Sequence, residues 1–259
     1  MLGTNMVKRL NIYYLYQLLR LNVFPRYTLT STRLMGKKLL VPDSASFLSM
    51  YSGIIEKEIY KFNTTSKNPY IIDCGANIGL SIIYFKKIYP NARIIAFEPD
   101  KKIFKILKKN IQSFNLENVK LIQKGVWSKK STMNFYSEGA DAGRIITNTH
   151  IDKTSKIYTV KLNDFLNKTV DFLKIDIEGA EIDVLESSKE KLSNVKNLFV
   201  EYHSFTNQKQ RLDKIIKILL DQNFRIYINS PGFSSRQPFI SRDIYKGMDI
   251  QLGIYAFRE

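Results

Sequence analysis

The chain has 259 residues, of which 44% are hydrophobic, and a formal net charge of +16. A sequence of this length and apolar content can bury a substantial core, and it contains no low-complexity tract that would suggest disorder. Its apolar runs fall short of the roughly 20 residues that a membrane-spanning helix needs, and no basic region leads into a long apolar core as in a secretory signal. We therefore expect a cytoplasmic globular domain with a small N-terminal addition. The single cysteine, Cys74, excludes an intramolecular disulfide and a cysteine-rich zinc site.

Residues 1–42 predict a helical and extended addition to this domain. Residues 5–22 place apolar side chains at helical spacing beside basic ones. Such a helix docks on the domain, pairs with a second copy in a homodimer, or lies peripherally on the inner membrane, and the pattern does not choose among the three. A proline ends the helix, and residues 27–41 predict a short extended pair. A capped helix over 43–62 then opens the main domain, which spans 43–259.

A glycine-containing turn follows a short buried strand at residues 70–72. The strand continues into Asp73-Cys74-Gly75-Ala76-Asn77-Ile78-Gly79, and a helical pattern runs on to about residue 89. The two glycines permit a tight strand-to-helix turn in which a ligand lies against bare backbone. A dinucleotide fingerprint would have glycine where this chain has Asn77 and Leu80. The turn therefore favours a ligand without a pyrophosphate.

An acidic residue, Glu98, follows the second predicted strand near 93–97 and precedes Pro99. A carboxylate at this point can accept hydrogen bonds from both ribose hydroxyls of a bound nucleoside. The two turns together describe a site for a nucleoside that carries a polar tail. S-adenosylmethionine (SAM) is such a ligand, and Asp73 at the end of the first strand is placed to help hold its ammonium group.

A third motif, Leu173-Lys174-Ile175-Asp176-Ile177-Glu178-Gly179-Ala180-Glu181, makes the interpretation specific. With these three motifs in order, the chain resembles the FkbM family of SAM-dependent methyltransferases over roughly residues 43–257. The resemblance implies a Rossmann-like class I methyltransferase fold, which is a doubly wound α/β fold with a seven-stranded, mostly parallel sheet. The motifs and the resemblance assign the following cofactor-binding residues: Asp73, Gly75, Ala76, Asn77, Gly79, Glu98, Pro99, Gly125, Val126 and Asp176.

The remaining pattern alternates strands with helices, as a doubly wound sheet requires. The predicted strands lie near residues 119–123, 170–175, 197–201, 224–229 and 249–257. The predicted helices lie near residues 101–114, from 179 onwards, and over 207–222. Between 126 and 160 the pattern changes to short alternating segments joined by polar loops. We interpret this stretch as a small β-rich insertion that forms a substrate rim, with a flexible surface loop as the alternative.

The candidate catalytic residues follow strands, because the ligand crevice of a doubly wound sheet lies at the carboxyl ends of its strands. An acceptor hydroxyl is a poor nucleophile until it loses its proton, so a base or a metal is needed nearby. His203 is the first candidate base, because an unperturbed histidine is largely neutral at pH 7. Asp176 is a second base or a carboxylate that orients the ligand. Glu178 is placed with them, whereas Glu181 is assigned to the N-terminus of the following helix.

These side chains, together with Glu201, could also converge on Mg²⁺ or Mn²⁺. Sequence alone does not establish convergence, so we assign no metal ligand from the sequence.

The sequence thus predicts a SAM-dependent O-methyltransferase that acts on a hydroxyl of a sugar, a glycan intermediate or a secondary metabolite. The alternative is an RNA ribose methyltransferase assisted by Lys174, since 40 basic residues against 24 acidic ones suit a nucleic-acid partner. The basic residues are scattered along the chain, however, which favours a small-molecule, sugar or glycan acceptor over nucleic acid without excluding RNA.

Overall fold

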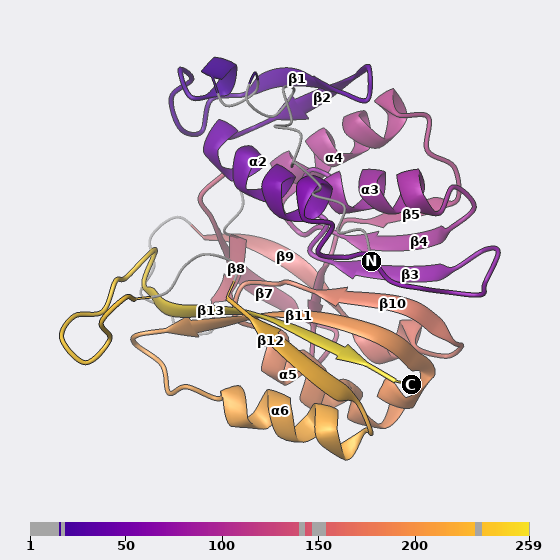
Figure 1. The fold of residues 1–259 in the computed structure, drawn as a ribbon, viewed down its shortest axis with the longest axis vertical. Coiled ribbons are helices and arrows are strands. Elements are labelled where there is room, and N and C mark those ends of the chain that lie inside the picture. Colours follow the sequence, from indigo (N-terminus) through magenta and orange to yellow (C-terminus); the bar gives the residue numbers. More distant parts are fainter. Residues whose placement is uncertain (1–15, 17–18, 140–142, 147–153, 231–234, 259) are drawn as a thin grey trace, which may run out of the picture.

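The computed structural model describes the chain except residues 1–15, 17–18, 140–142, 147–153, 231–234 and 259. Most of the helix predicted over 5–22 lies outside the described residues. The described part is an α/β fold built on one seven-stranded sheet (Figure 1). None of its helices is both long enough and apolar enough to cross a bilayer.

The central sheet has the strand order β12-β13-β11-β10-β3-β4-β5. Its strands are β3 (Tyr70–Cys74), β4 (Arg93–Phe97), β5 (Val119–Ile122), β10 (Val170–Ile175), β11 (Val195–Phe205), β12 (Arg225–Asn229) and β13 (Met248–Phe257). The strands are parallel except β13, which runs antiparallel to both β11 and β12. The predicted class I methyltransferase architecture, with a final antiparallel pair, is confirmed.

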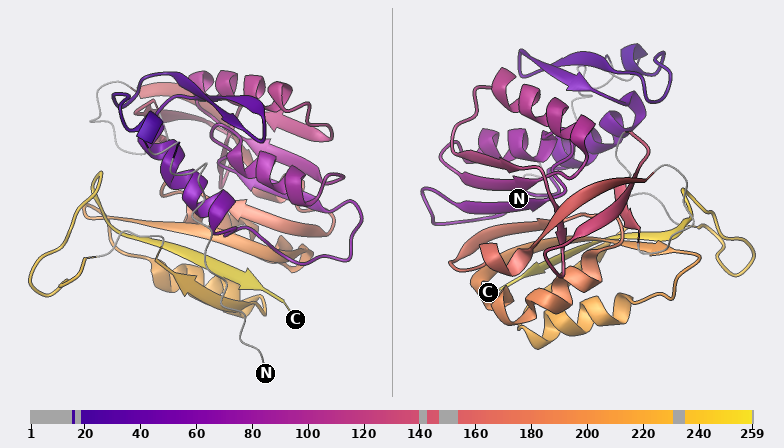
Figure 2. Two further views of the ribbon diagram at one scale, coloured as in Figure 1. Left: turned by 45° about the horizontal axis from the view of Figure 1, so that its top comes forward. Right: turned by 180° about the vertical axis from the view of Figure 1, so that it is seen from behind.

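Helices cover both faces of this sheet (Figures 1 and 2). One face carries α2 (Ser44–Tyr51), the π-helical η1 (Ser52–Glu56), α3 (Leu80–Ile88) and α4 (Lys101–Ser113), and the other carries α5 (Glu181–Ser188) and α6 (Leu212–Asp221). Short 3₁₀ turns lie at η2 (Leu162–Phe165) and η3 (Lys189–Asn194). Successive strand residues alternate between two cores, with Ile71 in the first and Ile72 in the second. Both cores therefore depend on near-continuous apolar strands.

The N-terminal hairpin of β1 (Thr30–Leu34) and β2 (Lys37–Val41) packs on α4. Asn110 of α4 is fully buried and clips the hairpin in place, because its side chain accepts from Leu40 N and donates to the carbonyls of Leu40 and Ile78. The same amide thus joins the extension to the glycine turn after β3.

The helix predicted over 43–62 is shorter than expected. Asp43 caps α2 by accepting from Ser46 N at 3.0 Å, but the helical segment ends at Glu56. Glu58 has left-handed backbone (φ 50°), which stops helix propagation. Tyr60 and Phe62 then pack their rings against the sheet, and the Phe62 ring centroid lies 5.0 Å from that of Phe172. This packing outweighs the local helical pattern.

The stretch between the third and fourth parallel strands forms a second, four-stranded sheet of order β6-β9-β7-β8. Its strands are β6 (Gly125–Trp127), β7 (Thr132–Ser137), β8 (Gly143–Ile146) and β9 (Thr154–Lys161). The right-hand view of Figure 2 shows these strands beside the central sheet. The β-rich character predicted for this insertion is confirmed.

Strand β11 extends four residues beyond the predicted end at residue 201. Its parallel pairing with β10 stops at the pair of Val200 and Ile175, whereas its antiparallel pairing with β13 continues to Phe205. Glu201 and His203 therefore stand on a part of β11 that overhangs its parallel neighbour. The extra length of β11 depends on pairing with β13, which lies more than 40 residues later in the chain, so the local sequence pattern predicted a shorter strand.

Gly75 is required by the approach of two backbones. A Cβ atom built at this position, where φ is +99°, would lie 1.9 Å from the carbonyl oxygen of Asp176. Gly79 (φ +90°) packs instead against α4, where an added Cβ would lie 2.7 Å from Leu107 Cδ1. Both glycines of the turn thus serve chain packing as well as turn conformation.

We expect Gly75→Ala to destabilise the protein far more than Gly36→Ala. Gly36 also has positive φ (+77°), but an added Cβ there meets nothing within 4 Å. The control substitution should cost about 1 kcal/mol of unfolding free energy from backbone strain alone. Gly75→Ala should cost several times that amount, or prevent folding, because the backbone of Asp176 must move. Equal losses in urea unfolding would contradict the proposed backbone contact.

Candidate active site

A cavity of about 380 Å³ opens at the carboxyl ends of β3, β4 and β10. Its lining includes most of the predicted cofactor residues, namely Gly75, Ala76, Asn77, Glu98, Pro99, Gly125, Val126 and Asp176. Glu178 and Glu201 line the same cavity. This is the crevice position expected for a ligand in a doubly wound sheet, and its volume is within the range of small-molecule sites.

Glu98 forms one end of the cavity and is fixed by backbone groups. Its residue is only 7% exposed, and one carboxylate oxygen accepts from Asn77 N at 3.1 Å while the other accepts from Asp100 N at 2.8 Å. Burial raises the pKa of Glu98 to about 8, against the opposing effect of these hydrogen bonds. Two carboxylate oxygens offer about four acceptor positions, so two remain for ligand hydroxyls.

Asp73 and Gly79, although predicted to bind the cofactor, are not among the described residues that line the cavity. Asp73 is fully buried and accepts from the Ser81 hydroxyl at 2.5 Å. Its other oxygen lies 3.4 Å from Lys174 Nζ. The carboxylate ending β3 is thus turned into the protein, and the structure gives Asp73 a supporting position beneath the cavity.

Lys174 is a buried cation that joins the two turns of the site. Its residue is 3% exposed, and its ammonium donates to the carbonyl of Gly75 at 2.8 Å and pairs with Asp176 Oδ2 at 3.0 Å. Together with the contact to Asp73, these bonds engage the ammonium on several sides. Lys174 also lines the cavity, but its ammonium is already engaged by these three groups, which favours a structural role over the lysine-assisted ribose chemistry considered above.

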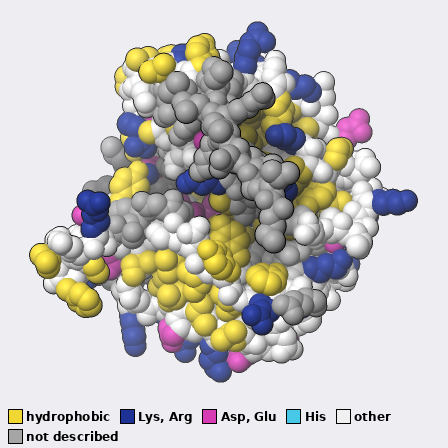
Figure 3. Space-filling model, viewed as in Figure 1, with side chains coloured by type: hydrophobic (Ala, Val, Ile, Leu, Met, Phe, Trp, Pro, Cys, Tyr) yellow, Lys and Arg dark blue, Asp and Glu magenta, His cyan; other side chains and the backbone are white. Residues whose placement is uncertain are grey.

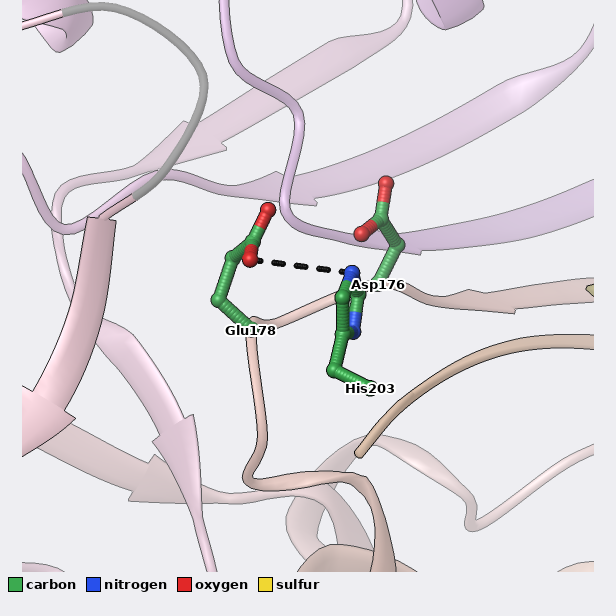
Figure 4. Close-up of side chains that lie close together, drawn as sticks. All are labelled: Asp176, Glu178 and His203. Atoms are coloured by element: carbon green, nitrogen blue, oxygen red, sulfur yellow. Dashed lines mark ion pairs between the residues drawn. The ribbon is translucent and has the colours of Figure 1, made fainter. Parts of the chain in front are cut away.

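The carboxylates of Asp176 and Glu178 meet His203 at the other end of the cavity (Figure 4). His203 Nδ1 lies 3.0 Å from Glu181 Oε1, and Nε2 lies 3.6 Å from Glu178 Oε2 and 3.7 Å from Glu201 Oε2. The imidazole side chain is fully buried, and it is not among the described groups that line the cavity. The three residues predicted to be catalytic are therefore brought together, but the carboxylates alone reach the open space.

Glu181 contacts both the turn before helix α5 and His203, whereas the sequence assigned it only to the helix N-terminus. Its residue is 1% exposed, and its carboxylate accepts from Gly179 N at 3.0 and 3.1 Å while also contacting His203. Helix α5 begins at Glu181, two residues later than predicted, because Glu178 (φ 57°) and Gly179 (φ 102°) have left-handed backbone. Such backbone in a non-glycine residue is costly and often marks a functional turn.

Mutual electrostatics set the protonation of this cluster. Burial would raise the pKa of Asp176, but Lys174 and His203 outweigh burial, so the pKa of Asp176 is lowered. Burial and the adjacent Asp176 raise the pKa of Glu201 well above its usual range. Burial opposes charging of His203, yet Glu178 and Glu181 raise its pKa well above the ordinary value. Four carboxylate side chains surround the ring, and their effect on its pKa opposes the neutral His203 expected at pH 7.

Two walls of the cavity come from segments in which no site residue was predicted from the sequence. The helical segment of α2 and η1, with Tyr60 beyond it, contributes Ser46, Ser49, Met50, Ser52, Gly53, Ile54, Lys57, Ile59 and Tyr60. The β-rich insertion contributes Phe135, Ser137, Gly143 and Ile145, which is the position expected of a substrate rim. No motif marks the first wall, because most of its side chains are small or apolar and are typical of ordinary packing.

Comparison with known proteins identifies the family. A model described as the methyltransferase FkbM domain matches residues 73–226, which is more than half of the chain. The chain belongs to the FkbM methyltransferase family. Its domain is therefore that of a SAM-dependent methyltransferase.

Individual relatives agree with this assignment. Methyltransferase sdnD of Sordaria araneosa is 29% identical over 189 residues, which are 59% of this chain and 73% of that protein. The 2-O-methyltransferase NoeI of Sinorhizobium fredii is 24% identical over 156 residues, which are 52% of this chain and 63% of that protein. The crystal structure of Methyltransferase FkbM from Methylobacillus flagellatus KT has the same fold, with a TM-score of 0.50 and 15% identity over 82% of this chain and 53% of that one.

The charge of this FkbM domain is distributed unevenly. Lys and Arg side chains are scattered over the face shown in Figure 3 and do not gather in one patch. One end of the cavity is lined by Asp176, Glu178 and Glu201, with the buried Lys174 ammonium 3.0 Å from Asp176.

We expect the buried Glu98 to give the cofactor-free protein a specific pH dependence. Because its folded pKa of about 8 is above the usual value of 4.5, the folded state holds a proton that the unfolded state has lost between these two pH values. Stability therefore falls as pH rises through this window, by on the order of 1 kcal/mol per pH unit for this group. Urea unfolding from pH 5 to 8 should show this slope as the difference between the wild-type protein and Glu98→Gln. Parallel stability curves for the two proteins would contradict it.

Proposed function

We propose that this protein is a SAM-dependent O-methyltransferase that acts on a hydroxyl of a sugar, a glycan intermediate or a secondary metabolite. The observation that carries the proposal is a single cavity with two different ends. One end has Glu98, a buried carboxylate suited to a ribose, and the other has Asp176, Glu178 and Glu201. Methyl transfer requires the donor and the acceptor hydroxyl to be held next to each other, and a cavity with these two ends can hold both.

The residues present fit SAM. Glu98 would accept the two ribose hydroxyls, Ala76 and Asn77 would lie along the tail, and Gly125 and Val126 would border the adenine. Because the cofactor carries a positive sulfonium and an ammonium group, an acidic cavity is electrostatically suited to it. Backbone N–H groups already hold the Glu98 carboxylate in place, so this side chain loses little conformational freedom when SAM binds.

The protein's own task is to position the acceptor and receive its proton. SAM supplies a methyl group on a sulfonium sulfur, which keeps the electrons of the broken C–S bond and becomes a neutral thioether. The acceptor oxygen forms the new C–O bond, and its proton passes to the carboxylate cluster. Asp176 is the ionised member of that cluster because Lys174 and His203 lower its pKa, while the pKa of Glu201 is raised. A pair of carboxylates with separated pKa values is a common arrangement for acid-base work.

Two observations support this proposal. The relative NoeI is named as a 2-O-methyltransferase, which supports transfer to an oxygen atom. Asp176, Glu178 and Glu201 would also disfavour an acceptor whose hydroxyl is flanked by phosphates, as a ribose in RNA is.

Glu98→Ala should weaken SAM binding by on the order of 100-fold, because two hydrogen bonds to the ribose hydroxyls would be lost. Isothermal titration of the purified variant measures this effect. Glu117→Ala, at an exposed surface position, should leave the affinity unchanged. Equal affinity in both variants would remove Glu98 from the cofactor site.

Methyl transfer from labelled SAM tests the acceptor class. The purified protein would be offered sugar nucleotides, extracted lipid-linked glycans, small hydroxylated metabolites and total RNA in parallel. We expect label in a sugar, glycan or metabolite fraction. Label in RNA alone would overturn the acceptor class while leaving the methyltransferase assignment in place.

The same assay checks the role of the carboxylate cluster. Asp176→Asn should slow turnover by roughly 10²- to 10⁴-fold with little change in cofactor affinity, since a proton acceptor is lost. Asp164→Asn is the matched control, because Asp164 lies at the surface in an ion pair with Lys130. Turnover of Asp176→Asn at the control rate would exclude Asp176 from proton removal.

A further inference from the structure

Three side chains from two strands converge at the acidic end of the cavity. Asp176 and Glu178 follow β10, and His203 stands on the overhanging part of β11. One oxygen from each carboxylate and one imidazole nitrogen all lie within 4.8 Å of one another. Figure 4 shows the imidazole directed toward the space between the two carboxylates.

The imidazole provides a second, independent observation. His203 is 4% exposed, and its Nε2 atom has no hydrogen-bond partner among the described residues. The nearest carboxylate oxygens, on Glu178 and Glu201, are 3.6 and 3.7 Å away, which is beyond hydrogen-bonding distance. A buried polar atom without such a partner is rare and calls for an explanation.

Glu181 orients this imidazole in the way that carboxylates orient metal-bound histidines. Its Oε1 lies 3.0 Å from Nδ1 and is therefore placed to accept the Nδ1 proton. With that proton held on Nδ1, Nε2 would direct its lone pair toward Asp176 and Glu178 once it gives up its own proton. A carboxylate, a histidine and a metal in this sequence form a recurring unit, in which the carboxylate fixes the ring and raises its basicity.

We propose that Asp176, Glu178 and His203 form a binding site for a divalent transition-metal cation, of which Mn²⁺ is the best match. Two carboxylate oxygens favour a hard cation, whereas an imidazole nitrogen favours a transition metal over Mg²⁺. Mn²⁺ accepts both kinds of ligand. Ligation would replace any proton on Nε2, as it does for every histidine ligand.

The three groups are close enough to share one ion once the carboxylates move inward. With a bond length of roughly 2.2 Å, ligand atoms are roughly 3.1 Å apart when adjacent and roughly 4.4 Å apart when opposite. The three atoms here all lie within 4.8 Å of one another, so ligation requires movements of up to about 1–2 Å. Asp176 and Glu178 are not held rigidly by burial, since their side chains are 23% and 18% exposed.

The cation's role in catalysis rests on the proposed function. Three protein ligands leave coordination positions open toward the cavity, where an acceptor hydroxyl could bind and be made more acidic. A hydroxyl bound there would release its proton more readily to the carboxylate cluster that lines the cavity. The acceptor class narrows accordingly to molecules whose reacting hydroxyl can reach a metal.

Electron paramagnetic resonance of Mn²⁺ titrated into the metal-free full chain tests the site directly. We expect one saturable site in the wild-type protein, in the absence of cofactor and acceptor. Glu178→Gln and His203→Gln should each weaken Mn²⁺ binding by at least about 100-fold. Glu190→Gln is the control. Glu190 is exposed in η3, after the C-terminal end of α5, and this variant should bind Mn²⁺ as tightly as the wild-type protein does.

Glu178→Gln keeps the test decisive if the buried histidine variant fails to fold, because Glu178 is partly exposed. Absence of saturable binding in the wild type, or unchanged binding in Glu178→Gln, would overturn the cation site. If the protein binds no Mn²⁺ and methyl transfer continues at full rate in the presence of a chelator, the cation site is overturned and the proposed function stands. Saturable binding that depends on Glu178, in a protein that methylates no offered hydroxyl, would support the site and count against the proposed function.

Discussion

The site depends on one buried ammonium group. Lys174 lies at the end of β10, and it links the carbonyl of Gly75 with the carboxylates of Asp73 and Asp176. Breaking a buried ion pair by removing one partner commonly costs 3–5 kcal/mol, roughly, because the other charge stays behind without compensation. The ammonium therefore fixes the glycine turn and the Asp176 turn relative to each other, and the cavity lies between those turns.

The overhang of β11 is the second determinant of the site. Parallel strands that end together would leave a shallow edge, but β11 continues past β10, which places Glu201 in the cavity lining and the buried His203 behind it. His203 pairs in register with Gln251 of β13, which also lines the cavity. The antiparallel strand thus supports the part of the site that the parallel strands alone could not build. The packing of Phe205 against Gly179 and Arg144 further ties this overhang to the third motif and to the insertion.

Much of this arrangement could be predicted from the sequence, because it rests on local signals. The apolar strands, the glycines at 75 and 79, and Glu98 after β4 are short-range patterns with direct physical meaning. Other features depended on contacts that no local pattern records. The helix after Asp43 stopped early because Tyr60 and Phe62 pack on the sheet, and β11 was longer because β13 pairs with it.

Side-chain roles were harder to predict than element positions. An aspartate at the end of β3 is compatible with either ligand binding or support, and only its contact with Ser81 distinguishes the two. The carboxylates that raise the pKa of His203 come from two separate segments, so no local pattern around residue 203 records them. Whether Asp176, Glu178 and Glu201 meet depends on the register between β10 and β11, which is a tertiary property.

The support that β13 gives to His203 bears on how the domain should be delimited. The family model covers residues 73–226, whereas β13 begins at Met248 and the wall formed by α2 and η1 precedes residue 57. A fragment cut to the matched region would retain the glycine turn, Glu98 and the Asp176 motif. It would lose the strand that registers His203 and one side of the ligand cavity. Expression boundaries for this protein, and sequence searches for functional equivalents, therefore need to include the flanking segments that the family signature leaves out.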